Sequence, residues 1–165
     1  MDKIFQRIIN NNFSELKGTI IQASVPVPAY LINEMIPVAL QGNKTIASCQ
    51  VSIHPQNKVS ANVKMRLLPW PLNLKLRLDH AVDVASFSSP KIRAWLENNL
   101  LLGRFGAFFN ALPEGVKLYG NQVGIDISAF LQTPEQRRIL ELIKSIEIST
   151  EEDKLILDVR IEVEI

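Results

Sequence analysis

The sequence of 165 residues contains one cysteine and two histidines, and it has almost no excess of charge of either sign. One cysteine cannot form an intramolecular disulfide, and these three side chains are too few for a structural zinc site. The 18 Lys and Arg residues are balanced by 17 Asp and Glu residues, which leaves a net charge of +1. Such a chain has no overall positive field to attract DNA or RNA, so we expect no nucleic-acid partner.

Long hydrophobic runs are also absent. The most apolar stretch, residues 100–112, is interrupted by two glycines, an arginine and an asparagine, and it is shorter than the roughly 18 apolar residues of a membrane-spanning helix. Residues 1–13 carry an early acid and lack the apolar centre of a signal peptide. The sequence therefore predicts a cytoplasmic protein with no transmembrane segment.

The chain has enough apolar residues for one core, because 47% of its residues are hydrophobic and 21% are charged. This length suits a single domain spanning residues 1–165. Residues 2–16 place apolar side chains three to five positions apart, which predicts an amphipathic helix, docked on the domain or peripheral to it. Its polar side carries Lys3 and Arg7, so a peripheral membrane contact is an alternative. A second helix is predicted from Pro28 to about Leu40.

Most other segments alternate apolar and polar residues, which is typical of strands. Between residues 44 and 83 this alternation predicts an antiparallel meander with one apolar and one polar face. Further strands are predicted at residues 19–27, 116–119, 122–127, 146–148 and 155–165.

Two more helices are predicted. Ser88-Ser89-Pro90 is typical of a helix start and predicts a long helix from about Lys91 to Leu112, and Thr133-Pro134-Glu135 opens a shorter one that ends near Lys144. The expected fold is α+β: a long, curved antiparallel sheet of about seven or eight strands, wrapped on the long hydrophobic helix, with two or three further helices.

Polar side chains suggest little chemistry. Cys49, His54 and His80 lie on neighbouring predicted strands, as a Cys–His hydrolase would need. Cys49, however, alternates in phase with Val51 and Ile53 and therefore points to the apolar face, where a thiolate is disfavoured. No glycine-rich phosphate loop and no metal-ligand spacing occurs. We expect a protein that is not an enzyme and holds no cofactor or metal.

The predicted helices carry more apolar surface than one sheet face can cover. Three arrangements would cover this excess apolar surface. The sheet could enclose the long helix in a solid core, the helix and sheet could leave a channel for an acyl chain, or the second apolar face could be a homodimer or partner contact. Six residues of the predicted long helix lie away from its first apolar stripe: Leu101, Leu102, Phe105, Phe108, Phe109 and Leu112.

The order of elements resembles the half-barrel module of the tubular lipid-binding (TULIP-like) superfamily and the LmeA-like domains of small bacterial proteins. The resemblance is carried by residues 18–33, by residues 120–127 and by the hairpin at residues 146–161. It implies a lipid carrier or membrane-associated binder without enzymatic chemistry. This chain departs from those families because it shows no leader and no lipoprotein cysteine.

We therefore expect non-enzymatic binding of an apolar ligand, a lipid acyl chain, between the long helix and the curled sheet. The alternative is a structural or protein-interaction domain that dimerises through the apolar helix face. The candidate lining residues share an apolar side chain on a predicted helix: Leu31, Met35, Trp95, Leu102, Phe105, Phe108 and Phe109.

Overall fold

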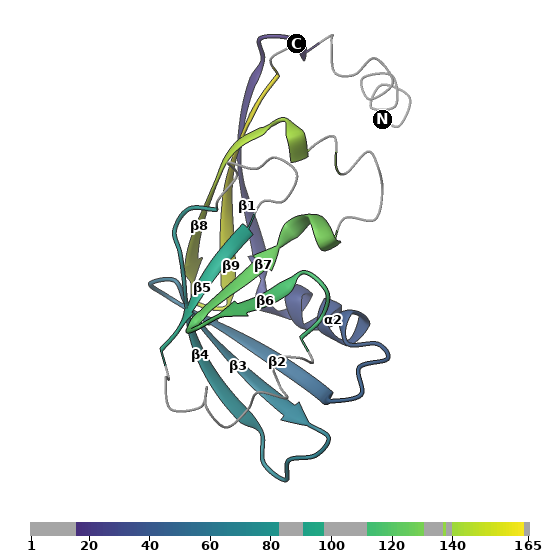
Figure 1. The fold of residues 1–165 in the computed structure, drawn as a ribbon. Helices are drawn as coiled ribbons and strands as arrows, with labels where there is room; N and C mark the ends of the chain where they lie inside the picture. The colour runs from purple at the N-terminus through teal and green to yellow at the C-terminus, as the bar shows by residue number, and fades with distance from the viewer. Residues whose placement is uncertain (1–15, 83–90, 98–111, 131–136, 138–139, 164–165) are drawn as a thin grey trace.

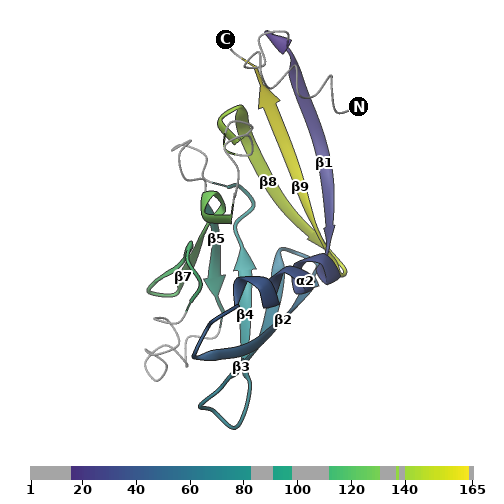
Figure 2. The same ribbon diagram turned by 90° about the vertical axis from the view of Figure 1, so that its right-hand side faces the viewer.

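The computed structural model describes residues 16–82, 91–97, 112–130, 137 and 140–163 (Figure 1). Its elements follow in the order β1 (Ile20–Pro28), α2 (Ala29–Ala39), β2 (Ile46–His54), β3 (Lys58–Met65), β4 (Leu72–Leu78), β5 (Lys91–Leu96), β6 (Val116–Tyr119), β7 (Gln122–Asp126), the 3-10 helix η3 (Ile127–Phe130), β8 (Ile143–Glu151) and β9 (Lys154–Glu162). The strands form two antiparallel sheets that extend in different directions from a common junction (Figures 1 and 2).

The smaller sheet has three strands in the order β1-β9-β8, so the first strand of the fold pairs with the last. The β8–β9 hairpin turns at Glu152 and Asp153, and Asp153 adopts the left-handed conformation that such a tight turn requires. Pro26 and Pro28 lie within β1. Proline is tolerated there because β1 pairs on one side only, and the missing N–H groups can face the free edge.

The larger sheet has six strands in the order β2-β3-β4-β5-β7-β6. Directly opposite residues of an antiparallel pair lie on the same face, so the register assigns one continuous apolar face to this sheet. The row Ile53, Val59, Leu76, Leu96 illustrates it, since each residue stands opposite the next. The alternate row Ser60 and Lys75 lies on the polar face.

Helix α2 covers the free edge of β2. The Asn33 side chain accepts a hydrogen bond from the Val51 N–H at 2.7 Å and donates one to the Val51 carbonyl at 2.8 Å. An amide side chain thus takes the place of a neighbouring strand at an edge that would otherwise be open to aggregation. Leu40, just after the helix, packs on the buried cluster of the larger sheet.

The core consists of two clusters. One lies on the apolar face of β2–β4 and contains Ile46, Ala61, Val63, Met65 and Leu72. The other joins the two sheets: Val82, Ile146 and Ile148 are buried, with side chains of β4, β5, β9 and η3 packed around them. Both sheets therefore turn their apolar faces toward the same interior.

The predicted strands between residues 44 and 83, the strands near residues 116–127, the C-terminal hairpin and helix α2 are confirmed. The predicted fold class is wrong. Strands dominate the described residues, which form sheets of three and six strands instead of one long sheet wrapped on a long helix.

The decisive error lies at residues 91–96, which form strand β5 and not the start of a long helix. The helix-start signal at residues 88–90 is local, whereas β5 pairs with β4 on one side and with β7 on the other. Ladder pairing on both edges outweighs a local start signal. The rest of the predicted long helix, residues 98–111, and the predicted N-terminal helix lie outside the described residues.

Candidate functional site

The candidate site is the apolar face of the three-stranded sheet. Antiparallel register arranges this face in rows that run from β1 across β9 to β8. The four rows are Val27–Leu155–Thr150, Val25–Leu157–Ile148, Ala23–Val159–Ile146 and Ile21–Ile161–Ile143. All members except Thr150 are apolar, so β1 and the distant β8–β9 hairpin build one continuous hydrophobic surface.

Exposure along these rows changes from one edge to the other. At β8, Ile148 is 0% exposed and Ile146 is 7% exposed. The middle strand, β9, is half-buried along this face. At β1, Val25 is 45% exposed and Ile21 is 40% exposed. The same face is therefore core at one edge and accessible surface at the other, and we call the Ile21–Val25 side of it the open edge.

The covered side is closed by the connection that follows β4. The His80 carbonyl accepts a hydrogen bond from the Ile148 N–H at 2.6 Å, and the Val82 N–H donates to the Ile146 carbonyl at 2.9 Å. Residues 80–82 thus act as a short fourth strand beside β8, in line with the bridge between Ala81 and Glu147. They bring Val82 onto the apolar rows and bury them.

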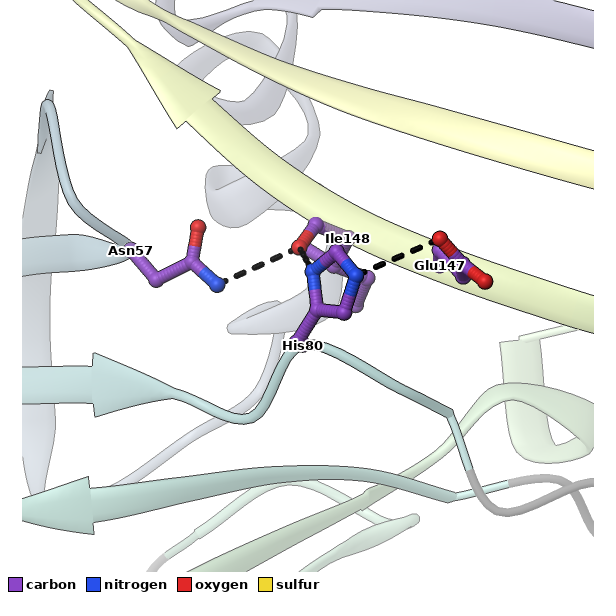
Figure 3. Close-up of polar contacts among 4 residues, drawn as sticks. All are labelled: Asn57, His80, Glu147 and Ile148. Atoms are coloured by element: carbon purple, nitrogen blue, oxygen red, sulfur yellow. Dashed lines mark hydrogen bonds and ion pairs between the residues drawn. The ribbon is translucent and has the colours of Figure 1, made fainter.

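Polar side chains from two loops of the larger sheet also bind β8 (Figure 3). The Asn57 amide donates to the Ile148 carbonyl at 3.2 Å, and His80 Nδ1 lies 3.0 Å from the same oxygen. His80 Nε2 lies 3.2 Å from Glu147 Oε2. Two loops of the larger sheet therefore meet at one carbonyl of β8.

Thr150 completes the junction. Its hydroxyl accepts a hydrogen bond from the Asn57 N–H at 2.7 Å and donates one to the His54 carbonyl at 2.6 Å. Thr150 is 7% exposed, and its two bonds satisfy both polar groups of a turn in which Gln56 and Asn57 have positive φ. Thr150 thereby links β8 to the turn between β2 and β3.

The three predicted lining residues that the structure describes lie on different elements. Leu31 and Met35 lie on the outer side of α2 and are 39% and 66% exposed. Trp95 lies on β5, and its position between the buried Ala94 and Leu96 places it on the polar face of the larger sheet. Its indole N–H donates to Asp79 at 2.8 Å. The prediction that Trp95 belongs to a helical lining is wrong, because β5 alternates with a period of two.

The other predicted lining residues, Leu102, Phe105, Phe108 and Phe109, lie outside the described residues. The residues of the open edge were visible in the sequence only as an alternating strand. Alternation shows which side chains share a face, but it does not show that β1 lies at a sheet edge, where no strand of the described residues continues the ladder.

The polar side chains singled out in the sequence lie apart. Cys49 is half-buried against the core of the larger sheet, and desolvation by burial raises the pKa of its thiol. A raised pKa disfavours the thiolate that a nucleophile needs. His54 Nε2 lies 2.9 Å from the Ser60 hydroxyl. Within the described ranges no group of three His, Cys, Asp or Glu side chains could hold a metal ion.

Among the described residues, no helix has the length and apolarity needed to cross a bilayer. Compared with known proteins, the chain matches no family model, no curated protein and no solved structure. The candidate site therefore rests on its own geometry.

Proposed function

We propose that the chain binds an apolar ligand, a lipid acyl chain, along the open edge of the three-stranded sheet, without enzymatic chemistry. The observation that carries the proposal is the exposure of Ile21 and Val25 on a face whose other side is core. Burying a side chain of this size stabilises by about 1.5–3 kcal/mol, so leaving both accessible is costly unless a ligand covers them.

The shape of the surface favours an extended chain. Each strand of this sheet has nine residues, and the four rows follow one another along the strands. Their apolar side chains therefore form a strip that runs in the strand direction, which we call the apolar strip. Aliphatic side chains make up the strip, and no charged residue occurs in its four rows. Such a surface offers dispersion contacts and no directional hydrogen bonds from side chains, which suits a hydrocarbon better than a polar metabolite.

The test uses two substitutions that place the same carboxylate on opposite faces of β1. Val25→Asp places it on the apolar strip, whereas Gln22→Asp places it on the polar face, across from Arg160. Both positions are exposed, so neither change should prevent folding. Titration with a fluorescent long-chain fatty acid should give at least about ten-fold weaker binding for Val25→Asp, and little change for Gln22→Asp.

Failure of the wild-type protein to bind the fatty acid, or equal binding by both variants, contradicts the proposal. Native mass spectrometry of the purified protein provides a second measurement, because a bound lipid adds mass that organic extraction removes.

A second candidate function is homodimerisation through α2. Leu31, Met35 and Val38 follow helical spacing along the side opposite to the one that packs on β2, and Val38 is 70% exposed. A stripe of this kind is typical of a contact with another chain. Light scattering tests it: a dimer has twice the monomer mass, and Met35→Asp should return it to monomer without changing fatty-acid binding.

A further inference from the structure

The loop between β3 and β4 lies at one end of the molecule (Figure 1). It carries two exposed large apolar side chains. Leu67 is 86% exposed and Trp70 is 60% exposed. Between them, Leu68 packs on the buried cluster of the larger sheet and anchors the loop. Pro69 and Pro71 restrict the backbone on either side of Trp70. Leu67 and Trp70 are therefore presented by an anchored loop, and we call residues 66–71 the hairpin tip.

A second loop lies beside the hairpin tip. The Arg66 N–H donates to the Thr45 carbonyl at 2.9 Å, and Arg66 Nε donates to the Asn43 carbonyl at 3.4 Å. The Asn43 side chain in turn accepts bonds from the N–H groups of Thr45 and Ile46. The connection between α2 and β2, which carries Lys44, is thus held against the base of the tip.

The segment of the chain that carries the tip has charge of one sign. Residues 35–78 contain no Asp or Glu, although they make up α2 from Met35 onward and all of β2, β3 and β4. The same stretch contains the cations Lys44, Lys58, Lys64, Arg66, Lys75 and Arg77. The strands of the other sheet, β1, β9 and β8, carry charges of both signs, with three cations and four acids. The net charge of +1 therefore conceals one basic stretch of the chain.

We infer that the hairpin tip docks on the surface of an anionic lipid bilayer. Leu67 would enter the boundary of the acyl chains, and Trp70 would lie at the level of the headgroups, where indole rings are favoured. Lys44, Lys64 and Arg66 surround the tip and would contact acidic headgroups. This inference goes beyond the proposed function and depends on other residues, since the open edge lies on the other sheet.

A nucleic acid is the main alternative partner for a basic sheet, and it would engage a different surface from the tip. Single-stranded nucleic acids bind where aromatic rings lie among the basic residues, so that bases can stack. Such rings, Trp95 and Tyr119, share a row of the polar face with Lys58 and Arg77, at the other end of β3 and β4 from the hairpin tip. An aliphatic side chain such as Leu67 gains most in hydrocarbon and little from a base.

The experiment measures partition of the full chain onto vesicles of phosphatidylcholine alone and of phosphatidylcholine mixed with phosphatidylserine. We expect binding to the mixed vesicles, weakened by added salt, and much weaker binding to neutral ones. The chain has two tryptophans, so Trp95→Phe leaves Trp70 as the only reporter. Its emission should shift to the blue and be quenched by brominated lipids when vesicles are added.

Substitutions then separate the apolar and the charged contributions. Leu67→Ser and Trp70→Ser should each lower the partition coefficient about ten-fold or more. Lys64→Gln should lower it about five-fold. Tyr119→Ser is the matched control for Trp70, because Tyr119 is 58% exposed on β6, and Lys117→Gln on the same strand is the control for Lys64. Neither control should change partition by more than about two-fold.

Several results would overturn the inference: no binding to either vesicle, equal binding to both, or tip variants that bind like the wild type. A fall in oligomeric mass for Trp70→Ser without vesicles would show instead that the tip contacts a second copy. Displacement from vesicles by a single-stranded oligonucleotide, with dependence on Lys58 and Arg77 and not on Trp70, would assign the basic face to nucleic acid. Val25→Asp should leave vesicle binding unchanged, which separates this inference from the proposed function.

Discussion

The two outer strands of the smaller sheet, β1 and β8, carry the same alternation of apolar and polar residues but differ in what covers them. β8 is flanked by residues 80–82 and by the Asn57 turn, and its apolar side chains are core. No described strand pairs with the outer edge of β1, and its apolar side chains Ile21 and Val25 are accessible. The comparison teaches that alternation defines a face, whereas sheet order and neighbouring loops decide whether that face becomes core or binding surface.

Truncation along one row should give the largest contrast. Ile148 and Val25 lie in the same row, on either side of Leu157. Ile148→Ala should lower the free energy of unfolding by about 2–5 kcal/mol, because it leaves a cavity among buried side chains. Val25→Ala should cost less than about 1 kcal/mol, since half of this side chain is already in contact with water. Urea unfolding measures both. Similar losses would mean that β1 is covered as β8 is, and the open edge would not exist.

The buried hydroxyl of Thr150 should give the next largest effect. Thr150→Val keeps the shape of the side chain but leaves the Asn57 N–H and the His54 carbonyl without their partner. The loss of stability should be about 1–3 kcal/mol. Thr150→Ser retains the hydroxyl and serves as the control, with a smaller loss from the missing methyl group. A Thr150→Val protein as stable as the wild type would show that this turn does not help to join the sheets.

The sequence predicted the strands of the fold better than their arrangement. Residues 46–54, 58–65 and 72–78 alternate regularly and are joined by short turns, so local rules suffice for them. Pairing of β1 with β9 links the two ends of the chain, and pairing of β5 with β4 and β7 spans long connections. These contacts are not encoded in any single window of residues.

The same limit applies to the candidate site. That Ile21 and Val25 share a face follows from the sequence, but that the face is open follows only from the position of β1 at a sheet edge. The prediction that placed Trp95 in a helix was wrong. It gave more weight to the local helix-start signal at residues 88–90 than to the short alternation of apolar and polar residues that follows it. The acid-free stretch at residues 35–78 was visible in the sequence, yet the balanced total charge concealed it.

The outer edge of β2 can also be compared with that of β1. Helix α2 covers the edge of β2, and both backbone groups of Val51 are bonded there. Asn33→Ala removes both hydrogen bonds to the Val51 backbone. Since Asn33 is only half-buried, water can replace part of the loss, and we expect about 1 kcal/mol in urea unfolding. Glu34→Ala, on the exposed side of α2, should stay within about 0.5 kcal/mol. Greater aggregation of Asn33→Ala than of Glu34→Ala would confirm that the helix protects the edge.

The smallest effect is expected for the ion pair at the junction. His80 and Glu147 are 66% and 56% exposed at the side chain, so solvent screens their attraction. Glu147→Gln should therefore change the free energy of unfolding by less than about 0.5 kcal/mol. The exposed pair of Glu151 and Lys154 provides the control, through Lys154→Gln. A loss above about 1 kcal/mol for Glu147→Gln alone would mean that charge, and not the backbone bridge of residues 80–82, closes β8. The contrast between β8 and β1 would then depend on salt as well as on sheet order.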